Sequence, residues 1–239
     1  MHPLLQRIKQ TPEIHEQLHN SINQADYLCT VTSFVNGFSY QELRKKNTFY
    51  QNIDYFYSDG ILSSIVFTII LNKTIPRVSF DYSSFAKTFF ETVEQYALPI
   101  FIVGSKEEQL KGAIHKFRQV YPNLNICGSH NGYFDDDEKV IKMINDSGAQ
   151  YVVCGLGTPK QDVFAQKIKS ALPNQVKQIY TCGGFIHQSV ERINYYPKLI
   201  NKYHLRWLYR ATREPVVIKR LLTKYPLFGI YALIDRFKK

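Results

Sequence analysis

Short β-forming segments alternate with helix-like segments along most of this chain, and the β-forming segments end in turns that contain glycine. Strands that run parallel need long crossover connections, and helical segments of this length supply them. The alternation therefore predicts an α/β fold, with a Rossmann-like, mostly parallel sheet and helices on both faces. The clearest predicted strands are 99–105, 124–128, 149–155 and 177–182.

Two further strands are expected near the N-terminus, over 26–32 and 49–57. The first leads into a turn at 33–37, and the second leads into Ser58-Asp59-Gly60. Ligands of such sheets bind at the carboxyl ends of the strands, so the residues that follow the strands should share one edge. These residues are Asn36, Asp59, Gly104, His130, Gln161 and Gly183.

Asp59 has two interpretations from its immediate neighbours. It follows a predicted strand and precedes an apolar, helix-like segment, which places its carboxylate at the rim of the sheet, where it can act on a ligand. Ser-Asp before a helix is also an ordinary N-cap, and the local sequence alone favours this second interpretation. The choice between them depends on what else reaches the same edge.

The C-terminal part of the chain is strongly basic. The net charge is +10, and residues 198–239 contribute +9, from eleven Lys or Arg and two acidic residues. Apolar residues are interleaved with these cations, a composition typical of helices that lie on an anionic membrane surface. Pro215 and Pro226 are expected to divide the segment into two or three short helices. We therefore divide the chain into an α/β core, 1–194, and a basic, amphipathic, membrane-associating appendage, 195–239.

Several kinds of site are not indicated. The four cysteines are far apart and show no Cys-x-x-Cys spacing, so neither a zinc site nor a disulfide framework is predicted. Gly155-Leu156-Gly157 at a strand-to-helix junction favours phosphate binding, but it is neither a Walker loop nor a complete dinucleotide fingerprint. The acidic run 135–138 is better explained as a helix start than as a metal site. No metal or other cofactor is expected.

Six stretches, taken in order, resemble one family: the WecG/TagA/CpsF glycosyltransferases of bacterial surface-polysaccharide assembly, glycosyltransferase family 26. Each motif is weak alone, and the specificity comes from their order over roughly residues 26–222. The matching stretches are Val35-Asn36, Ser58-Asp59-Gly60, 77–81, 122–124 leading to 128–134, 155–162, and 205–210 with Glu214-Pro215.

The resemblance implies transfer of a sugar from a UDP-sugar, usually UDP-N-acetylmannosamine or a related donor, to an undecaprenyl-diphosphate-linked sugar. It implies inversion at the anomeric centre without a metal. Asp59 would be the catalytic base that takes the proton from the acceptor hydroxyl. Asn36 and Gln161 would position donor or acceptor, and Arg210 and Arg220 would bind the acceptor diphosphate. Further candidate substrate-binding residues are Arg77, Asp81, Tyr133 and Gly157, with Gly104 added from the predicted sheet edge.

The chain departs from the family pattern at three places. Phe34 stands where the family often has Thr, Val217 replaces a further cation of the tail, and 182–188 differs from the commoner version, which contains Asp. These departures bear on the identity of the donor sugar more than on the reaction class.

The location and partners follow from these features. No apolar run approaches the ~18 residues of a spanning helix, and the N-terminus lacks the apolar core of a signal peptide. We expect a cytoplasmic protein, peripheral on the inner face of the cell membrane, with a UDP-sugar, a lipid-linked acceptor and the anionic membrane surface as partners. The sequence leaves the oligomeric state open, a homo-oligomer included.

One alternative comes from a different class of protein. A nucleic-acid-binding or regulatory α/β module could use the same basic tail to bind a phosphate backbone. The tail is rich in Leu, Val and Ile rather than in polar residues that face solvent, so no nucleic-acid partner is expected.

Overall fold

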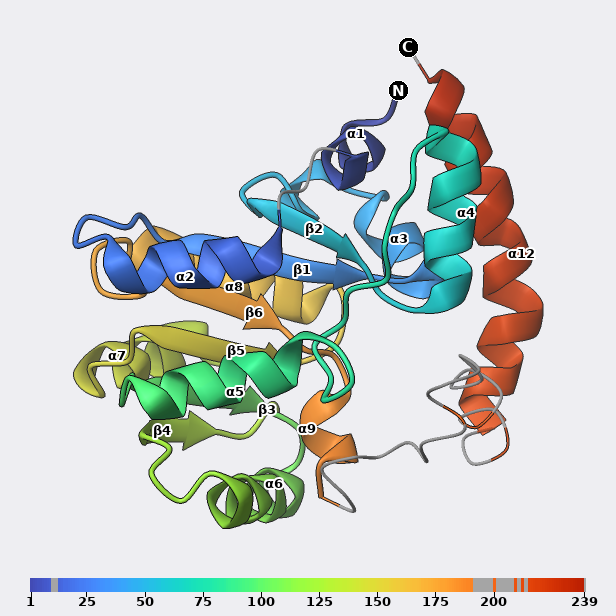
Figure 1. Cartoon of the computed structure of the whole chain (residues 1–239). Helices are drawn as coiled ribbons and strands as arrows, with labels where there is room; N and C mark the ends of the chain where they lie inside the picture. The colour runs from blue at the N-terminus through green and yellow to red at the C-terminus, as the bar shows by residue number, and fades with distance from the viewer. Residues whose placement is uncertain (10–12, 191–199, 201–208, 210–211, 213–214, 239) are drawn as a thin grey trace.

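The computed structural model describes residues 1–9, 13–190, 200, 209, 212 and 215–238. In this part of the chain a single sheet forms the centre of the molecule, and helices flank it (Figure 1). The N- and C-terminal ends lie near each other at one end of the structure (Figure 1).

The sheet has six strands, all paired in parallel, in the order β2-β1-β6-β5-β3-β4. The predicted parallel α/β fold is therefore confirmed. Because every strand points the same way, all carboxyl ends meet at one edge, and β1 and β2 end side by side with Val35 opposite Ser58. The strands are β1 (Thr30–Val35), β2 (Tyr55–Ser58), β3 (Ile100–Gly104), β4 (Ile126–His130), β5 (Tyr151–Gly155) and β6 (Gln178–Thr181).

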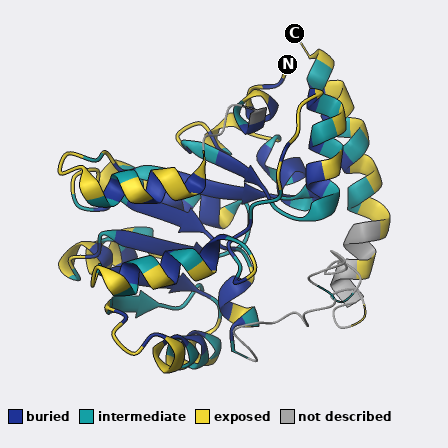
Figure 2. Cartoon of the chain, in the orientation of Figure 1, coloured by how far each residue is buried: buried dark blue, intermediate teal, exposed yellow. Residues whose placement is uncertain are grey.

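Helices cover both faces of the sheet, as predicted (Figure 1), and most of the sheet is buried (Figure 2). Each face has its own apolar core. Alternation along the strands supplies both cores: Phe101 and Val103 of β3 face one, and Ile100 and Ile102 face the other. One core takes residues from α1 (Pro3–Lys9), α3 (Gly37–Leu43), α4 (Ile61–Leu71), α7 (Asp137–Asp146), α8 (Lys160–Ala171) and α12 (Pro215–Phe237). The other takes residues from α2 (Ile14–Asn23), α5 (Phe85–Gln95), α6 (Glu107–Val120) and α9 (Phe185–Gln188).

The first two strands begin later than predicted. Residues 26–29 precede β1, and Leu28 there is 75% exposed, so the β-forming composition of this stretch is not used in the sheet. In the second case a 3-10 turn, η1 (Asn47–Phe49), comes before β2. The amide of Tyr50 donates to Asn47 O at 3.0 Å, and this local bond competes with strand pairing.

The predicted break at Pro226 is wrong, because α12 is one helix that contains this proline. A proline inside a helix removes one backbone hydrogen bond and costs about 3 kcal/mol. Packing opposes that cost, since Phe228 and Ala232 are fully buried and Phe228 meets the rings of Tyr40 and Phe67 edge-on. The last turns of α12 share a core with α3 and α4. The predicted division of the chain into a core, 1–194, and an appendage, 195–239, stays a prediction.

A buried ion pair fixes the end of α12. Both carboxylate oxygens of Asp235 accept from the guanidinium of Arg44 at 2.7 Å, and Oδ2 also accepts from the hydroxyl of Tyr40 at 2.7 Å. Burial alone would raise the pKa of Asp235, but the hydrogen bonds from Arg44 and Tyr40 outweigh it and the pKa is lowered. The carboxylate therefore stays charged and ties α12 to α3.

Candidate active site

A cavity of about 370 Å³ opens at the carboxyl edge of the sheet, over the ends of β2, β1, β6 and β5. This volume is within the range of small-molecule sites in proteins. One wall comes from the turns after β1 and β2 and contains the polar residues Asn36 and Asp59, while loops after β5 and β6 form the opposite wall. Of the residues predicted from sequence, the cavity brings together Asn36, Asp59, Arg77, Asp81, Gly157 and Gln161.

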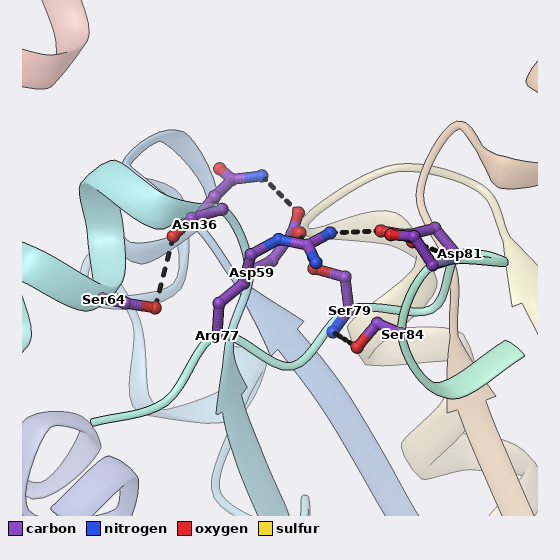
Figure 3. Close-up of polar contacts among 9 residues, drawn as sticks. Asn36, Asp59, Ser64, Arg77, Ser79, Asp81 and Ser84 are labelled. Carbon is purple, nitrogen blue, oxygen red and sulfur yellow. Dashed lines mark hydrogen bonds and ion pairs between the residues drawn. The ribbon is translucent and has the colours of Figure 1, made fainter. Parts of the chain in front are cut away.

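Asp59 lies in this cavity with both carboxylate oxygens held by neighbouring side chains (Figure 3). Ser79 Oγ donates to Oδ1, and Asn36 Nδ2 donates to Oδ2 at 3.3 Å. The backbone amide of Asp59 continues the strand pairing by donating to Val35 O at 2.9 Å. The half-buried carboxylate therefore has a fixed position with one side open to the cavity.

Asn36 is oriented by the helix that it caps. Its Oδ1 accepts from the amides of Phe38 and Ser39 at 3.0 Å, in a capping box at the start of α3. Those amides can only donate, so the amide oxygen must face them and Nδ2 must face Asp59. The side chain of Asn36 thereby connects the start of α3 to the carboxylate of Asp59, the candidate base.

The segment 77–81, one of the stretches that match the family, runs beside the end of β2. A bridge pairs Ser58 with Arg77, and the amide of Val78 donates to Ser58 O at 2.9 Å. This extension carries Ser79 to Asp59, and the Arg77 guanidinium forms an ion pair with Asp81 at the cavity wall (Figure 3). Ser79 was not selected from the sequence; its only signal was its position inside a matched motif.

The N-cap interpretation of Asp59 is wrong. Gly60 is the N-cap of α4, with a φ of 83°, and no side chain makes a capping hydrogen bond there. Glycine adopts this left-handed backbone without the steric cost of a Cβ. The turn at Gly60 lets α4 begin while the Asp59 side chain points away from the helix, toward Asn36 and Ser79.

Gln161 connects the two loops of the opposite wall. Its Oε1 accepts from the amide of Gly157 at 3.2 Å and from the amide of Gly183 at 3.1 Å, and the side chain is 3% exposed. Gly157 has a φ of 75° and Gly183 a φ of 54°, both in the left-handed region. The buried amide therefore fixes the relative position of the loops after β5 and β6.

Asp162, the next residue, is fully buried beneath the same wall. Ser33 Oγ donates to its Oδ1 at 2.7 Å. Burial raises the pKa of this carboxyl to about 6, although hydroxyl groups of Ser33 and Thr158 favour the charged form. Asp162 does not line the cavity, so we assign it a structural role beneath the loop after β5 and no role in the reaction.

Two predicted residues lie outside the cavity lining. Gly104 ends β3, and a Cβ there would come within 2.4 Å of Gly155 O, so its role in this structure is close packing between strands. Tyr133 is 73% exposed in the loop after β4. Lys160 holds that loop by donating to the carbonyls of Gly132 and Phe134 at 3.2 and 3.3 Å.

The two predicted tail arginines cannot be placed at the site. Arg210 lies outside the described residues, and Arg220 falls within α12 but its side chain lies outside the description. Their predicted contact with a diphosphate stays a prediction.

The acidic run after β4 forms the start of a helix, as predicted. Asp136 is the N-cap of α7 and accepts from the amide of Lys139 at 3.0 Å. Among the described residues, no three His, Cys, Asp or Glu side chains gather as a potential metal site. The expectation that no metal is needed stays a prediction.

The fold and the cavity define a class: a Rossmann-like α/β protein with a candidate general base at the carboxyl edge of its sheet. The chain belongs to the glycosyl transferase WecG/TagA/CpsF family, whose family model matches residues 5–239. It is 36% identical over 234 residues to the UDP-Gal:alpha-D-GlcNAc-diphosphoundecaprenol beta-1,4-galactosyltransferase of Shigella boydii. That match covers 97% of this chain and 95% of the relative. The resemblance found in the sequence is thus confirmed.

None of the helices in the described part of the chain is both long enough and apolar enough to cross a bilayer.

Proposed function

We propose that this glycosyltransferase moves a hexose from a UDP-sugar to the sugar of an undecaprenyl-diphosphate-linked acceptor, with inversion at the anomeric carbon. The family membership supports the reaction class, and the name of the Shigella boydii relative supports the donor and acceptor classes. The observation that carries the proposal is the carboxylate of Asp59, held by Asn36 and Ser79 inside the cavity.

Asp59 acts as the general base in this proposal. The acceptor hydroxyl donates to the open side of the carboxylate, and its oxygen attacks the anomeric carbon from the face opposite UDP. The O–H bond breaks, its proton goes to Asp59, and the new C–O bond forms as the bond to the UDP phosphate oxygen breaks. The electron pair of that bond leaves with UDP, so the configuration inverts. Asn36 and Ser79 hold the base in line with the hydroxyl.

The loops after β5 and β6 accommodate the donor in this proposal. Gly157 and Gly183 allow a close backbone approach, and α8 begins directly after the first of these loops, so its N-terminal dipole favours a phosphate. Arg210 and Arg220 would bind the acceptor diphosphate. No metal is included, because backbone amides and arginines can compensate the charge of UDP; transfer that survives EDTA would agree with this.

The donor sugar is the least specified part of the proposal. The sequence resemblance implies N-acetylmannosamine or a related hexose, whereas the Shigella boydii relative is named for galactose. Galactose is therefore the first donor to test, with N-acetylmannosamine beside it. We further propose that the protein works as a peripheral protein on the inner face of the cell membrane, where its acceptor would be embedded.

The test is a transfer assay with UDP-sugars and an undecaprenyl-diphosphate-linked N-acetylglucosamine, with the product identified by mass. Asp59→Asn should lower kcat by about 10²–10⁴-fold while the variant stays folded, because general base catalysis typically contributes that much. Asp136→Asn is the matched control, since Asn caps a helix as well as Asp does and this exposed residue does not line the cavity. Full activity of Asp59→Asn would refute the assignment of the base.

A second variant tests how the base is held. Ser79→Ala removes one of the two hydrogen bonds to the carboxylate, and it should lower kcat about tenfold with little change in KM. Ser79→Thr keeps the hydroxyl and should restore most of the rate. A loss confined to KM, or no rescue by Thr, would contradict a positioning role.

A further inference from the structure

Helix α4, which begins two residues after Asp59, has no charged residue along its length. Ile65 is 49% exposed and Ile69 is 71% exposed, and Ile61, one turn earlier, is partly exposed. These three recur every four residues and so lie on one stripe of the helix. A helix on the surface of a soluble protein normally has a polar outer face, and one that is apolar all round is covered by something.

Helix α12 lies beside α4 (Figure 1) and has a second apolar face. One face carries Phe228 and Ala232 into the core. The opposite face exposes a set of large apolar side chains at 41% to 76% of their area. This set is Leu222, Leu227, Ile230, Leu233, Ile234 and Phe237.

Both helices reach the cavity. The first turn of α4 contributes Ile61 and Leu62 to its lining, and α12 contributes Tyr225. Tyr225 is seated against Gly37, where a Cβ would come within 3.2 Å of its ring and within 2.9 Å of Phe228. An apolar chain attached to a group bound beside Asp59 would therefore leave the cavity along these two helices.

The charges around this apolar surface favour a lipid occupant over a second copy of the chain. Lys224 and Arg236 stand on the same helix as the exposed apolar face, and Lys238 follows its last residue. The described part of α12 has one acidic residue, Asp235, which is buried. Two copies placed face to face would bring these cations together, and like charges at close range repel. An anionic membrane surface attracts them instead.

We propose that α4 and the exposed face of α12 together form the membrane-docking surface, with Ile65 and Ile69 inserted among the acyl chains of an anionic bilayer. This inference rests on the proposed function only for the identity of the acceptor. It assigns the docking to a helix of the α/β core as well as to the basic segment. Docking through α4 places Asp59, two residues before that helix, next to the membrane interface, where the diphosphate of a lipid-linked acceptor lies.

The experiment uses the full chain and vesicles of phosphatidylglycerol and phosphatidylcholine in equal parts. The variant Ile65→Gln/Ile69→Gln should bind these vesicles at least about tenfold more weakly, because each isoleucine loses apolar burial in the bilayer. The matched control is Val120→Gln/Met143→Gln, which changes exposed apolar positions on α6 and α7 and should bind like the wild type. Unchanged binding by the α4 variant would overturn the proposal.

Two further measurements separate the remaining explanations. Transfer to an undecaprenyl-linked acceptor in vesicles should fall with binding, while transfer to a short-chain, water-soluble acceptor should stay as in the wild type. If sedimentation shows a dimer of the wild type that the α4 variant dissociates, the surface binds a second copy and the proposal is wrong. If the wild type transfers to neither acceptor, the proposed function fails, and vesicle binding still decides the docking surface.

Discussion

The carboxylate of Asp59 is held by two side chains whose own orientations are fixed by the backbone around them. These side chains are Asn36 and Ser79. Asn36 is held by two amides of α3, and the backbone amide of Ser79 donates to Ser84 Oγ at 3.1 Å at the start of α5. Each hydrogen-bond donor to Asp59 is thus set by a different element. Such pre-arrangement lets a carboxylate act without reorganising its surroundings during the reaction.

At the same scale, the raised pKa of the Asp162 carboxyl predicts how the stability of the folded protein depends on pH. Its pKa is raised by burial from 3.8 to about 6, so between these values the folded state keeps a proton that the unfolded state has lost. Stability therefore falls as the pH rises from about 4 to 6, by about 3 kcal/mol for a shift of about two units. Asp162→Asn does not titrate, and it can still accept from Ser33.

Chemical denaturation of both proteins from pH 4 to 7 measures this effect. The stability of the wild type relative to Asp162→Asn should decline through pH 4–6 and then stay constant. Parallel curves over the whole range would show that the buried carboxyl does not titrate as stated.

The sequence could predict which residues share an edge, but not which end of that edge each occupies. Asp59, Asn36 and Gln161 follow β2, β1 and β5, which lie near one another in the sheet order, and they meet at one cavity. Gly104 ends β3 and Tyr133 follows β4, and these are the last two strands of the same order. Strand order depends on long-range pairing, which local sequence patterns do not report.

Among the elements, α12 depends most on tertiary context. The sequence predicted a break at Pro226 because proline opposes helix continuation. Burial of Phe228 and Ala232 in the core outweighs that local preference. The many cations likewise predicted a segment that lies on the surface. In the structure, the buried ion pair between Asp235 and Arg44 holds the C-terminal end of α12 against α3.

At this scale we predict that Asp235→Ala destabilises the protein by about 3–5 kcal/mol, because it leaves the Arg44 guanidinium without its buried partner. Unfolding in urea, followed by circular dichroism, measures the change. The matched control is Asp146→Ala, which breaks an exposed pair with Lys142 and should leave the midpoint unchanged. Equal effects of the two substitutions would mean that the buried pair does not anchor α12.

In the whole molecule, charge and apolar surface are unevenly distributed. The chain carries a net charge of +10, and the segment that contains α12 supplies nearly all of it. The same helix exposes one apolar face and borders α4, whose outer stripe is also apolar. The cavity lies at the end of α4 and beside Tyr225 of α12. Lys224 and Arg236 of α12, the apolar surface and the candidate active site thus belong to one side of the structure.

This arrangement predicts two separable contributions to vesicle binding. Replacing Lys224, Arg236 and Lys238 by Gln should weaken binding to anionic vesicles by roughly fivefold per cation at low salt, and the loss should vanish at high salt because exposed charges are screened. The loss caused by Ile65→Gln/Ile69→Gln should persist at high salt, because apolar burial is not screened. Replacing Lys116, Arg118 and Lys139 by Gln is the control, with the same change in net charge on α6 and α7.

The control separates position from total charge: if both triple variants lose binding equally, net charge alone attracts the protein and the α12 surface has no special role. A DNA fragment, titrated under the same salt conditions, tests the remaining alternative. Binding to DNA that falls steeply with salt, without binding to vesicles, would favour a nucleic-acid-binding module. Binding to vesicles with a salt-resistant part that depends on α4 favours an enzyme that meets its acceptor at the membrane, because a phosphate backbone offers no apolar layer for Ile65 and Ile69 to enter.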